Sequence, residues 1–151
     1  MRRQRLAPIA VLLAVLLAVL LVACGDDASG TPTTIAATGS SGTIHISGGI
    51  AGIDETWVLA ADGTVLGPGS YVGLLTADQR TRLETAIVAA GFFDLDPEYL
   101  PDDPCCDRFN YEVTITSGGR THTVATIDGT DAPETLFALI GTLLEVVRPA
   151  A

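Results

Sequence analysis

The sequence contains no lysine, and its eight basic residues are all arginines, set against 18 aspartates and glutamates in 151 residues. A nucleic-acid-binding surface needs a basic face that neutralises phosphates, so we expect no nucleic-acid partner. The formal net charge is −10. Such an acidic surface favours solubility, and recognition of a basic partner is the alternative explanation.

Candidate catalytic groups are also few. His45 and His122 are the only histidines, and the chain has no G-x-S-x-G motif. Each histidine lies in an alternating, strand-like segment, where a side chain either points outward or is held within the sheet. The sequence therefore predicts no enzyme and no cofactor or metal bound by this pair.

A short acidic stretch resembles the first half of a calcium loop, with Asp94, Asp96 and Glu98 at alternating positions. However, Pro97 occupies the fourth position, and the glycine at the sixth position and the glutamate at the twelfth are missing. We expect an irregular solvated loop over 94–107 rather than a calcium site.

The N-terminus has the organisation of an export signal. Three arginines precede a Leu/Ala/Val run over 6–22, and Leu21-Val22-Ala23-Cys24 resembles a bacterial lipobox, in which the cysteine is lipidated, for example with palmitate. We expect a signal peptide over 1–23 and a lipid on Cys24 that holds the chain on the extracytoplasmic side of the membrane. Because the apolar run is about 18 residues long, an uncleaved membrane anchor is the alternative.

The segment after Cys24 is rich in Gly, Ser, Thr and Ala, so 24–42 is predicted to be the lipidated cysteine and a flexible linker. Cleavage removes three arginines and no acidic residue, which leaves a net charge of −13 (5 minus 18) on the mature chain. Residues 43–151 remain as one domain, which we expect to be monomeric.

Within this domain the pattern predicts an α+β fold in the order β-β-α-β-β-α. A helix begins at Thr76, where Gln79 completes a capping box, and ends at Gly91. A second helix is predicted after an Asp131 cap, with Pro133 and Glu134 in its first turn. Turn residues fill 61–75. Four strands give a four-stranded antiparallel sheet with both helices packed on one face; they are 43–47, 55–60, 109–116 and 121–127.

Three glycines, Gly48, Gly49 and Gly52, fall within the stretch HISGGIAGIDE. A phosphate-binding loop would lead into a helix and have a cation nearby, whereas this stretch leads into a strand and lacks one. The glycines therefore indicate either a tight turn that needs positive φ angles or an exposed recognition loop.

Cys105 and Cys106 are adjacent. In an oxidising compartment they could close a vicinal disulfide, pair with another chain or stay as free thiols, and the sequence leaves these alternatives open. Two adjacent thiolates without a nearby histidine do not indicate a metal site.

Several of these features together resemble the emfourin family of protein inhibitors of thermolysin-like zinc metallopeptidases such as protealysin. They are the stretch SGGIAGIDETW, a helix ending in AAGFF, the strand DRFNYEV, a Gly-Gly-Arg turn, a THTV strand, and Asp-Ala-Pro before the final helix. The resemblance implies an antiparallel sheet with helices that binds over a metallopeptidase cleft, where the zinc belongs to the target.

The predicted function is therefore that of a membrane-anchored inhibitor of a secreted metallopeptidase. The alternative is an envelope lipoprotein that binds proteins without inhibiting them. The candidate contact residues are those of the glycine-rich stretch and the two acidic residues after it: Gly48, Gly49, Ile50, Ala51, Gly52, Asp54 and Glu55.

Overall fold

The computed structural model describes residues 39–103 and 107–148. The predicted signal peptide, Cys24 and nearly all of the linker lie outside these residues, as do Cys105 and Cys106. The described residues belong to one compact unit, Ala36–Ala151, which contains every buried apolar residue between Ile44 and Val147. This unit therefore closes its own core. No helix within the described part is long and apolar enough to cross a membrane.

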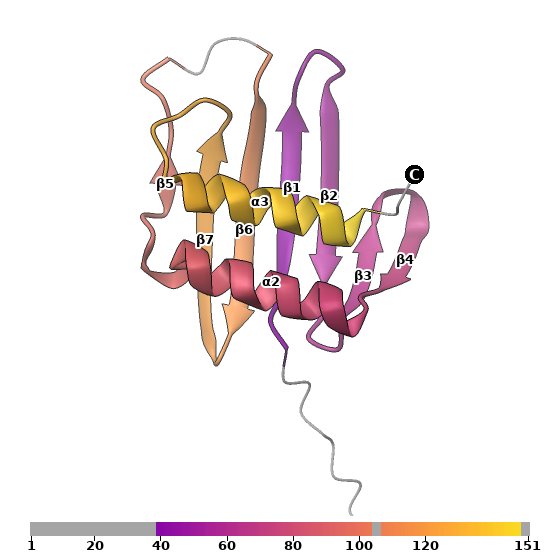
Figure 1. Cartoon of the computed structure of the whole chain (residues 1–151). Coiled ribbons are helices and arrows are strands. Elements are labelled where there is room, and N and C mark those ends of the chain that lie inside the picture. The colour runs from indigo at the N-terminus through magenta and orange to yellow at the C-terminus, as the bar shows by residue number, and fades with distance from the viewer. Residues whose placement is uncertain (1–38, 104–106, 149–151) are drawn as a thin grey trace, which may run out of the picture. The chain divides into compact units, whose positions relative to one another are not determined.

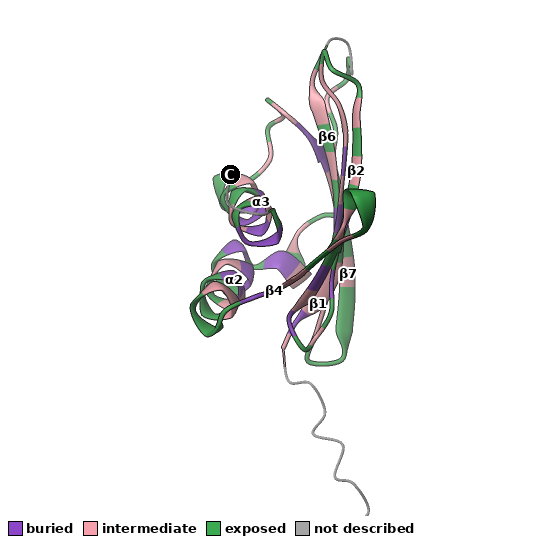
Figure 2. Cartoon of the chain, turned by 90° about the vertical axis from the view of Figure 1, so that its right-hand side faces the viewer, coloured by how far each residue is buried: buried purple, intermediate pink, exposed green. Residues whose placement is uncertain are grey.

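The domain has two layers (Figures 1 and 2). One layer is a seven-stranded sheet in the order β4-β3-β2-β1-β6-β7-β5. The other is a pair of helices, α2 (Ala77–Ala90) and α3 (Glu134–Val147), which cover one face of the sheet and leave the other face open. The strands are β1 (Ser41–Gly48), β2 (Ile53–Leu59), β3 (Thr64–Gly67), β4 (Tyr71–Leu74), β5 (Glu98–Tyr99), β6 (Phe109–Ser117) and β7 (Arg120–Ile127).

The predicted four-stranded antiparallel sheet is wrong, although the α+β class agrees with the structure. Seven strands form the sheet, and it is mixed, because β5 pairs in parallel with β7 while the other pairs are antiparallel. The missed strands β3 and β4 lie in the stretch 61–75, which was predicted to consist of turns because of its glycines. The third missed strand, β5, lies in the acidic segment 94–107.

Ring packing explains why glycines occur inside the β3–β4 hairpin. A Cβ at Gly67 would lie 2.3 Å from the Trp57 ring, and a Cβ at Gly73 would lie 2.5 Å from the Tyr71 hydroxyl. Trp57 and Tyr71 contact each other edge to face, with ring centroids 5.5 Å apart. The glycines thus make room for aromatic rings over a strand, which is a recognised reason for glycine in a sheet.

The two helices begin differently. The α2 prediction is confirmed: Thr76 and Gln79 form a capping box, Gly91 ends the helix with φ of 58°, and one face of the helix is buried. The predicted Asp131 cap of α3 is wrong, because Pro133 occupies the N-cap position and no side chain caps the helix. Proline fixes its own φ and lacks an amide hydrogen, so the helix starts directly after it.

The core lies between the helices and the central strands. Ile44 of β1 pairs with Trp57 of β2 on one side and with Val113 of β6 on the other. Leu136 and Leu139 of α3 lie over this layer and are fully buried. The strand β1 is therefore central in the sheet. Its direction determines where the chain enters the domain and where the glycine-rich turn lies.

The N-terminal end of β1 is held at the middle of α2. The amide and the hydroxyl of Ser40 donate hydrogen bonds of 2.7 and 2.8 Å to the two carboxylate oxygens of Glu84. From this point β1 crosses the whole sheet to the turn at the opposite end (Figure 1). The entry of the chain and the glycine-rich turn therefore lie at opposite ends of the domain.

Candidate functional site

The glycine-rich stretch forms the turn between β1 and β2. The amide of Gly52 donates to the carbonyl of Gly49 over 2.9 Å, so Ile50 and Ala51 are the two central residues of a β-turn. Gly48, Gly49 and Gly52 have φ angles of 99°, 68° and 61°, in the region that favours glycine. The prediction of a tight turn with positive φ angles is confirmed.

This turn is braced by the neighbouring strand β6. The Gly49 amide donates a 3.0 Å hydrogen bond to the Arg108 carbonyl. A Cβ at Gly48 would lie 2.3 Å from that carbonyl oxygen, and a Cβ at Gly49 would lie 2.6 Å from the Phe109 ring. By contrast, Gly52 has nothing within 4 Å of its missing Cβ. Two of the glycines are thus required by close packing, and the third by backbone conformation alone.

Ile50 lies at the apex of the braced turn and is 90% exposed, more than any other large hydrophobic side chain of the described residues. Ala51 and Gly52 beside it are exposed as well. An aliphatic side chain held away from the core by a fixed turn has no role in the packing of the domain. Single exposed aliphatic side chains are common on protein surfaces, so it is the position of Ile50 at the apex of a fixed turn that makes it a candidate contact.

The two acidic residues after the turn point to opposite faces of the sheet. Asp54 lies on the open face, where one carboxylate oxygen is 2.8 Å from Nε2 of His45. Its side chain remains 80% exposed. Asp54 is therefore accessible beside the turn, although it already has a partner.

Glu55 lies on the helix-bearing face and connects three parts of the domain. Its Oε2 accepts a 3.0 Å hydrogen bond from Arg148, just after α3, and a 3.3 Å hydrogen bond from Nε1 of Trp57. Because both donors converge on one oxygen of a partly buried carboxylate, Glu55 fixes the end of α3 against β2. Its position is that of a structural brace more than of a contact residue.

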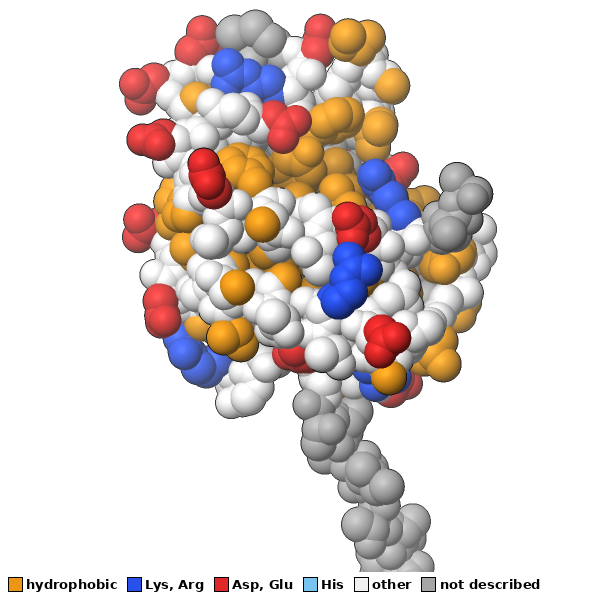
Figure 3. Space-filling view, in the orientation of Figure 1, with side chains coloured by type: hydrophobic (Ala, Val, Ile, Leu, Met, Phe, Trp, Pro, Cys, Tyr) orange, Lys and Arg blue, Asp and Glu red, His pale blue; other side chains and the backbone are white. Residues whose placement is uncertain are grey.

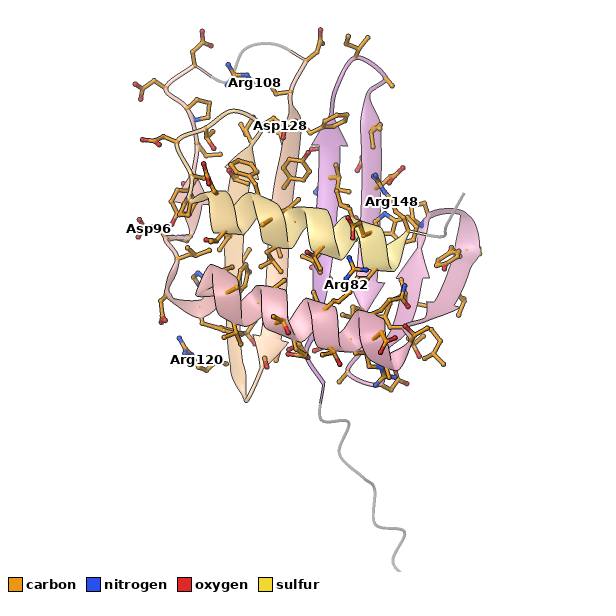
Figure 4. All side chains as sticks on the ribbon, viewed as in Figure 1. Arg82, Asp96, Arg108, Arg120, Asp128 and Arg148 are labelled. Atoms are coloured by element: carbon orange, nitrogen blue, oxygen red, sulfur yellow. The ribbon has the colours of Figure 1, made fainter. Side chains whose placement is uncertain are left out.

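Residues behind the turn form a support that the motif alone did not indicate. The Asp128 amide donates a 3.0 Å hydrogen bond to the Phe109 carbonyl. Figure 4 places Arg108 and Asp128 together at the end of the sheet that carries the turn. The pairing of β1 with β6 brings Gly48 opposite Phe109, so this support depends on a contact between residues that are far apart in the sequence. Within the sequence, the DRFNYEV stretch is the signal that contains Arg108 and Phe109.

Tyr111 connects this support to the core. Burial, together with the charge of Asp128 and the hydrogen bond with it, raises the pKa of the Tyr111 hydroxyl to about 12, and the nearby charge of Arg148 partly opposes this rise. The hydroxyl is therefore neutral at physiological pH and ties the loop after β7 to β6.

The raised pKa of Tyr111 predicts a loss of stability in alkali. In the unfolded chain the phenol ionises near 10, and in the folded chain it ionises near 12. The stabilisation is complete below the unfolded value and is lost as the pH rises through this window. After allowance for solvent screening we expect the wild-type protein to lose about 1 kcal/mol of unfolding free energy between pH 9 and pH 11, relative to Tyr111→Phe. Urea titrations of both proteins at the two pH values measure this difference, and equal losses would contradict the assignment.

The remaining titratable candidates are dispersed. His45 lies on the open face, whereas His122 lies on the helix-bearing face, where its Nε2 is 3.0 Å from the Leu95 carbonyl oxygen. Asp94 is 3.3 Å from an Arg120 nitrogen, and Glu98 belongs to β5. In the part of the chain that the structure describes, no three His, Cys, Asp or Glu residues lie close enough to hold a metal ion.

Charge is also dispersed. Figure 3 shows acidic side chains scattered over the helix-bearing face, and hydrophobic side chains gathered in its upper half, toward the turn. No single negative patch therefore surrounds the turn on this face. The distinguishing feature of this end of the domain is the exposed side chain of Ile50.

Comparison with known protein families connects this chain to a family of known function. The Emfourin family model matches residues 71–144, from β4 through most of α3. The matched range includes the Arg108–Phe109 support but begins after the β1–β2 turn. A comparison with curated proteins gives no match. Members of the Emfourin family inhibit metallopeptidases and are not enzymes. The resemblance of this chain to the Emfourin family is thus confirmed over residues 71–144.

Proposed function

We propose that this chain is a membrane-anchored inhibitor of thermolysin-like zinc metallopeptidases. The match to a family of metallopeptidase inhibitors supports the inhibitory role. The basic start, the apolar run and the Leu-Val-Ala-Cys ending support a lipid on Cys24 that holds the chain on the extracytoplasmic side of the membrane.

The observation that carries the proposed mode of binding is the exposure of Ile50 on a braced turn. A turn that is already ordered loses little conformational entropy when it binds, so more of the contact energy appears as affinity. Ile50 enters an apolar pocket of the peptidase cleft, with Ala51 and Gly52 beside it. The zinc belongs to the peptidase, and the inhibitor contributes no catalytic group.

The two acidic residues have different roles in this proposal. Glu55 is occupied by Arg148 and Trp57, so it keeps the strand after the turn in place. Asp54 is 80% exposed and close to the turn, so it contacts the rim of the cleft. Rim charges of this kind affect the association rate more than the final affinity.

The path of β1 suits an anchored inhibitor. Ser40 is held by Glu84 where the chain enters the domain, and the turn lies eight strand residues further on. At about 3.3 Å per residue, β1 separates the two points by about 26 Å. A tether that enters at Ser40 therefore leaves the turn at the end of the domain away from its attachment.

An inhibition titration tests the proposed function. The compact unit 36–151, which closes its own core, is added to a thermolysin-like peptidase at increasing molar ratio, and a serine peptidase serves as the control. We expect peptidase activity to fall linearly to a one-to-one equivalence point and the serine peptidase to stay active. If a panel of thermolysin-like peptidases keeps full activity with excess inhibitor, the chain binds without inhibiting them, as in the alternative function.

A further inference from the structure

The two edge strands of the sheet, β5 and β4, differ in how they are protected from pairing with another chain. At one edge, β5 has only two residues and lies between Pro97 and Pro101, in a segment rich in aspartate. Very short edge strands, prolines and charges are the features by which proteins prevent an edge from pairing with another chain. The β5 edge of the sheet is therefore protected from pairing with another chain.

The other edge, formed by β4, has less of this protection, because no charge lies near it and its only nearby proline, Pro68, precedes the strand. The strand β4 has four residues without proline, and the whole stretch 64–75 contains no charged residue in a chain of net charge −10. Among the described residues, β4 has a strand neighbour on one side only, which is β3. In Figure 1, β4 lies beyond the ends of both helices, so neither helix covers its free edge.

An exposed apolar strip adjoins this free edge. The register places Val58 of β2 opposite Leu66 of β3, and Leu66 opposite Val72 of β4, so the three side chains share the open face of the sheet. Leu74 lies two residues along β4 on the same face. The exposed fractions of the four side chains are 37%, 47%, 68% and 69% in this order. The rest of the open face is mainly threonine and charged or polar residues.

We propose that β4 pairs in antiparallel fashion with β4 of a second copy of this chain, so that two domains share one continuous sheet. A register centred on Gly73 places Val72 of each copy opposite Leu74 of the other. Residues directly opposite each other in an antiparallel pair lie on the same face, so the two apolar strips join across the twofold axis.

The absence of charge along this edge allows a second copy to occupy it. Two strongly acidic domains repel each other over most of their surfaces, and β4 with its uncharged neighbour β3 is where they can approach without opposing carboxylates. The contact is short compared with a standard interface, so we expect a weak dimer. This inference goes beyond the proposed inhibitory function, involves a different end of the domain from the turn, and replaces the monomer expected from the sequence.

Sedimentation equilibrium of the unit 36–151 over micromolar to millimolar concentrations tests the proposal. Reductant is present, so that Cys105 and Cys106 cannot link two copies. We expect a monomer–dimer equilibrium that tightens as salt rises, because salt screens the repulsion between the acidic domains. Val72→Glu should raise the dissociation constant by about tenfold or more, because two carboxylates then face the joined strip.

The matched control is Val88→Glu, which makes the same change at a side chain that is 80% exposed on α2. We expect it to leave the dissociation constant unchanged. Circular dichroism checks that the variants are folded, and Leu74→Glu replaces Val72→Glu if the latter unfolds. A monomer at every concentration and salt, or a dimer that Val72→Glu and Leu74→Glu do not weaken, would refute the pairing. A monomer whose complex with a peptidase is weakened by Val72→Glu would assign the edge to the peptidase instead.

Discussion

Replacing Ile50 by aspartate should weaken inhibition of a thermolysin-like peptidase by about 100-fold, with no change in the free energy of unfolding. The side chain is 90% exposed at the apex of the β1–β2 turn, so its replacement removes no packing within the domain. In the proposed complex it fills an apolar pocket, where a carboxylate would be buried without a partner. Inhibition constants from progress curves and urea unfolding of the same preparations measure the two effects.

Val88→Asp is the matched control for this substitution. Val88 is also an exposed aliphatic residue, but it lies on α2, away from the turn. We expect the inhibition constant of this variant to equal that of the wild type. Equal inhibition by Ile50→Asp and Val88→Asp would show that the turn does not enter the cleft.

The second large effect is expected from Gly48→Ala, which should lower the free energy of unfolding by about 3–5 kcal/mol. The new Cβ would lie 2.3 Å from the Arg108 carbonyl oxygen, and the φ angle of 99° is unfavourable for any residue with a side chain. The carbonyl cannot retreat without disturbing the pairing of β1 with β6, in which Gly48 lies opposite Phe109. Thermal or urea unfolding measures the loss.

Comparison with Gly52→Ala separates the cost of a steric clash from the cost of a left-handed backbone conformation. Its φ angle of 61° is also positive, but its Cβ would meet nothing within 4 Å. We therefore expect a loss of only about 1 kcal/mol, the usual penalty for a left-handed alanine. If the two alanine variants are equally stable, the brace from β6 contributes nothing to the turn.

Local chemistry made some elements predictable from the sequence. The α2 helix carries its start and end signals within the segment itself, in Thr76, Gln79 and Gly91, and the structure uses all three. The β6–β7 hairpin is equally local, since alternating residues flank a two-residue Gly118-Gly119 connection. Such signals depend on neighbours along the chain and need no knowledge of the tertiary contacts.

The missed strands depend on distant contacts. Gly67 and Gly73 look like loop residues in the sequence, but they are there because the Trp57 and Tyr71 rings lie against their backbone. The strand β5 consists of two residues that pair with Ala125 and Thr126 of β7, more than twenty residues away. Neither feature leaves a periodic pattern in its own segment, so the sheet was predicted with three strands too few.

The candidate site divides in the same way. The glycine pattern and the alternation around it predicted a turn between two strands, and the turn is present. The partners that brace it, Arg108 and Phe109, lie about sixty residues later, at the start of β6, and are set by the β1–β6 register. The different roles of Asp54 and Glu55 follow from the alternation of strand faces, but the partners of Glu55 come from α3 and β2.

Hydrogen exchange of the chain, measured free and in complex with a thermolysin-like peptidase, shows whether the β1–β2 turn enters the cleft of the peptidase. We expect the backbone amides of residues 48–53 to exchange more slowly in the complex, while those on the outer face of α2 are unchanged. An inhibitory complex in which these turn amides exchange as fast as in the free chain, with protection elsewhere, would contradict entry of the turn into the cleft.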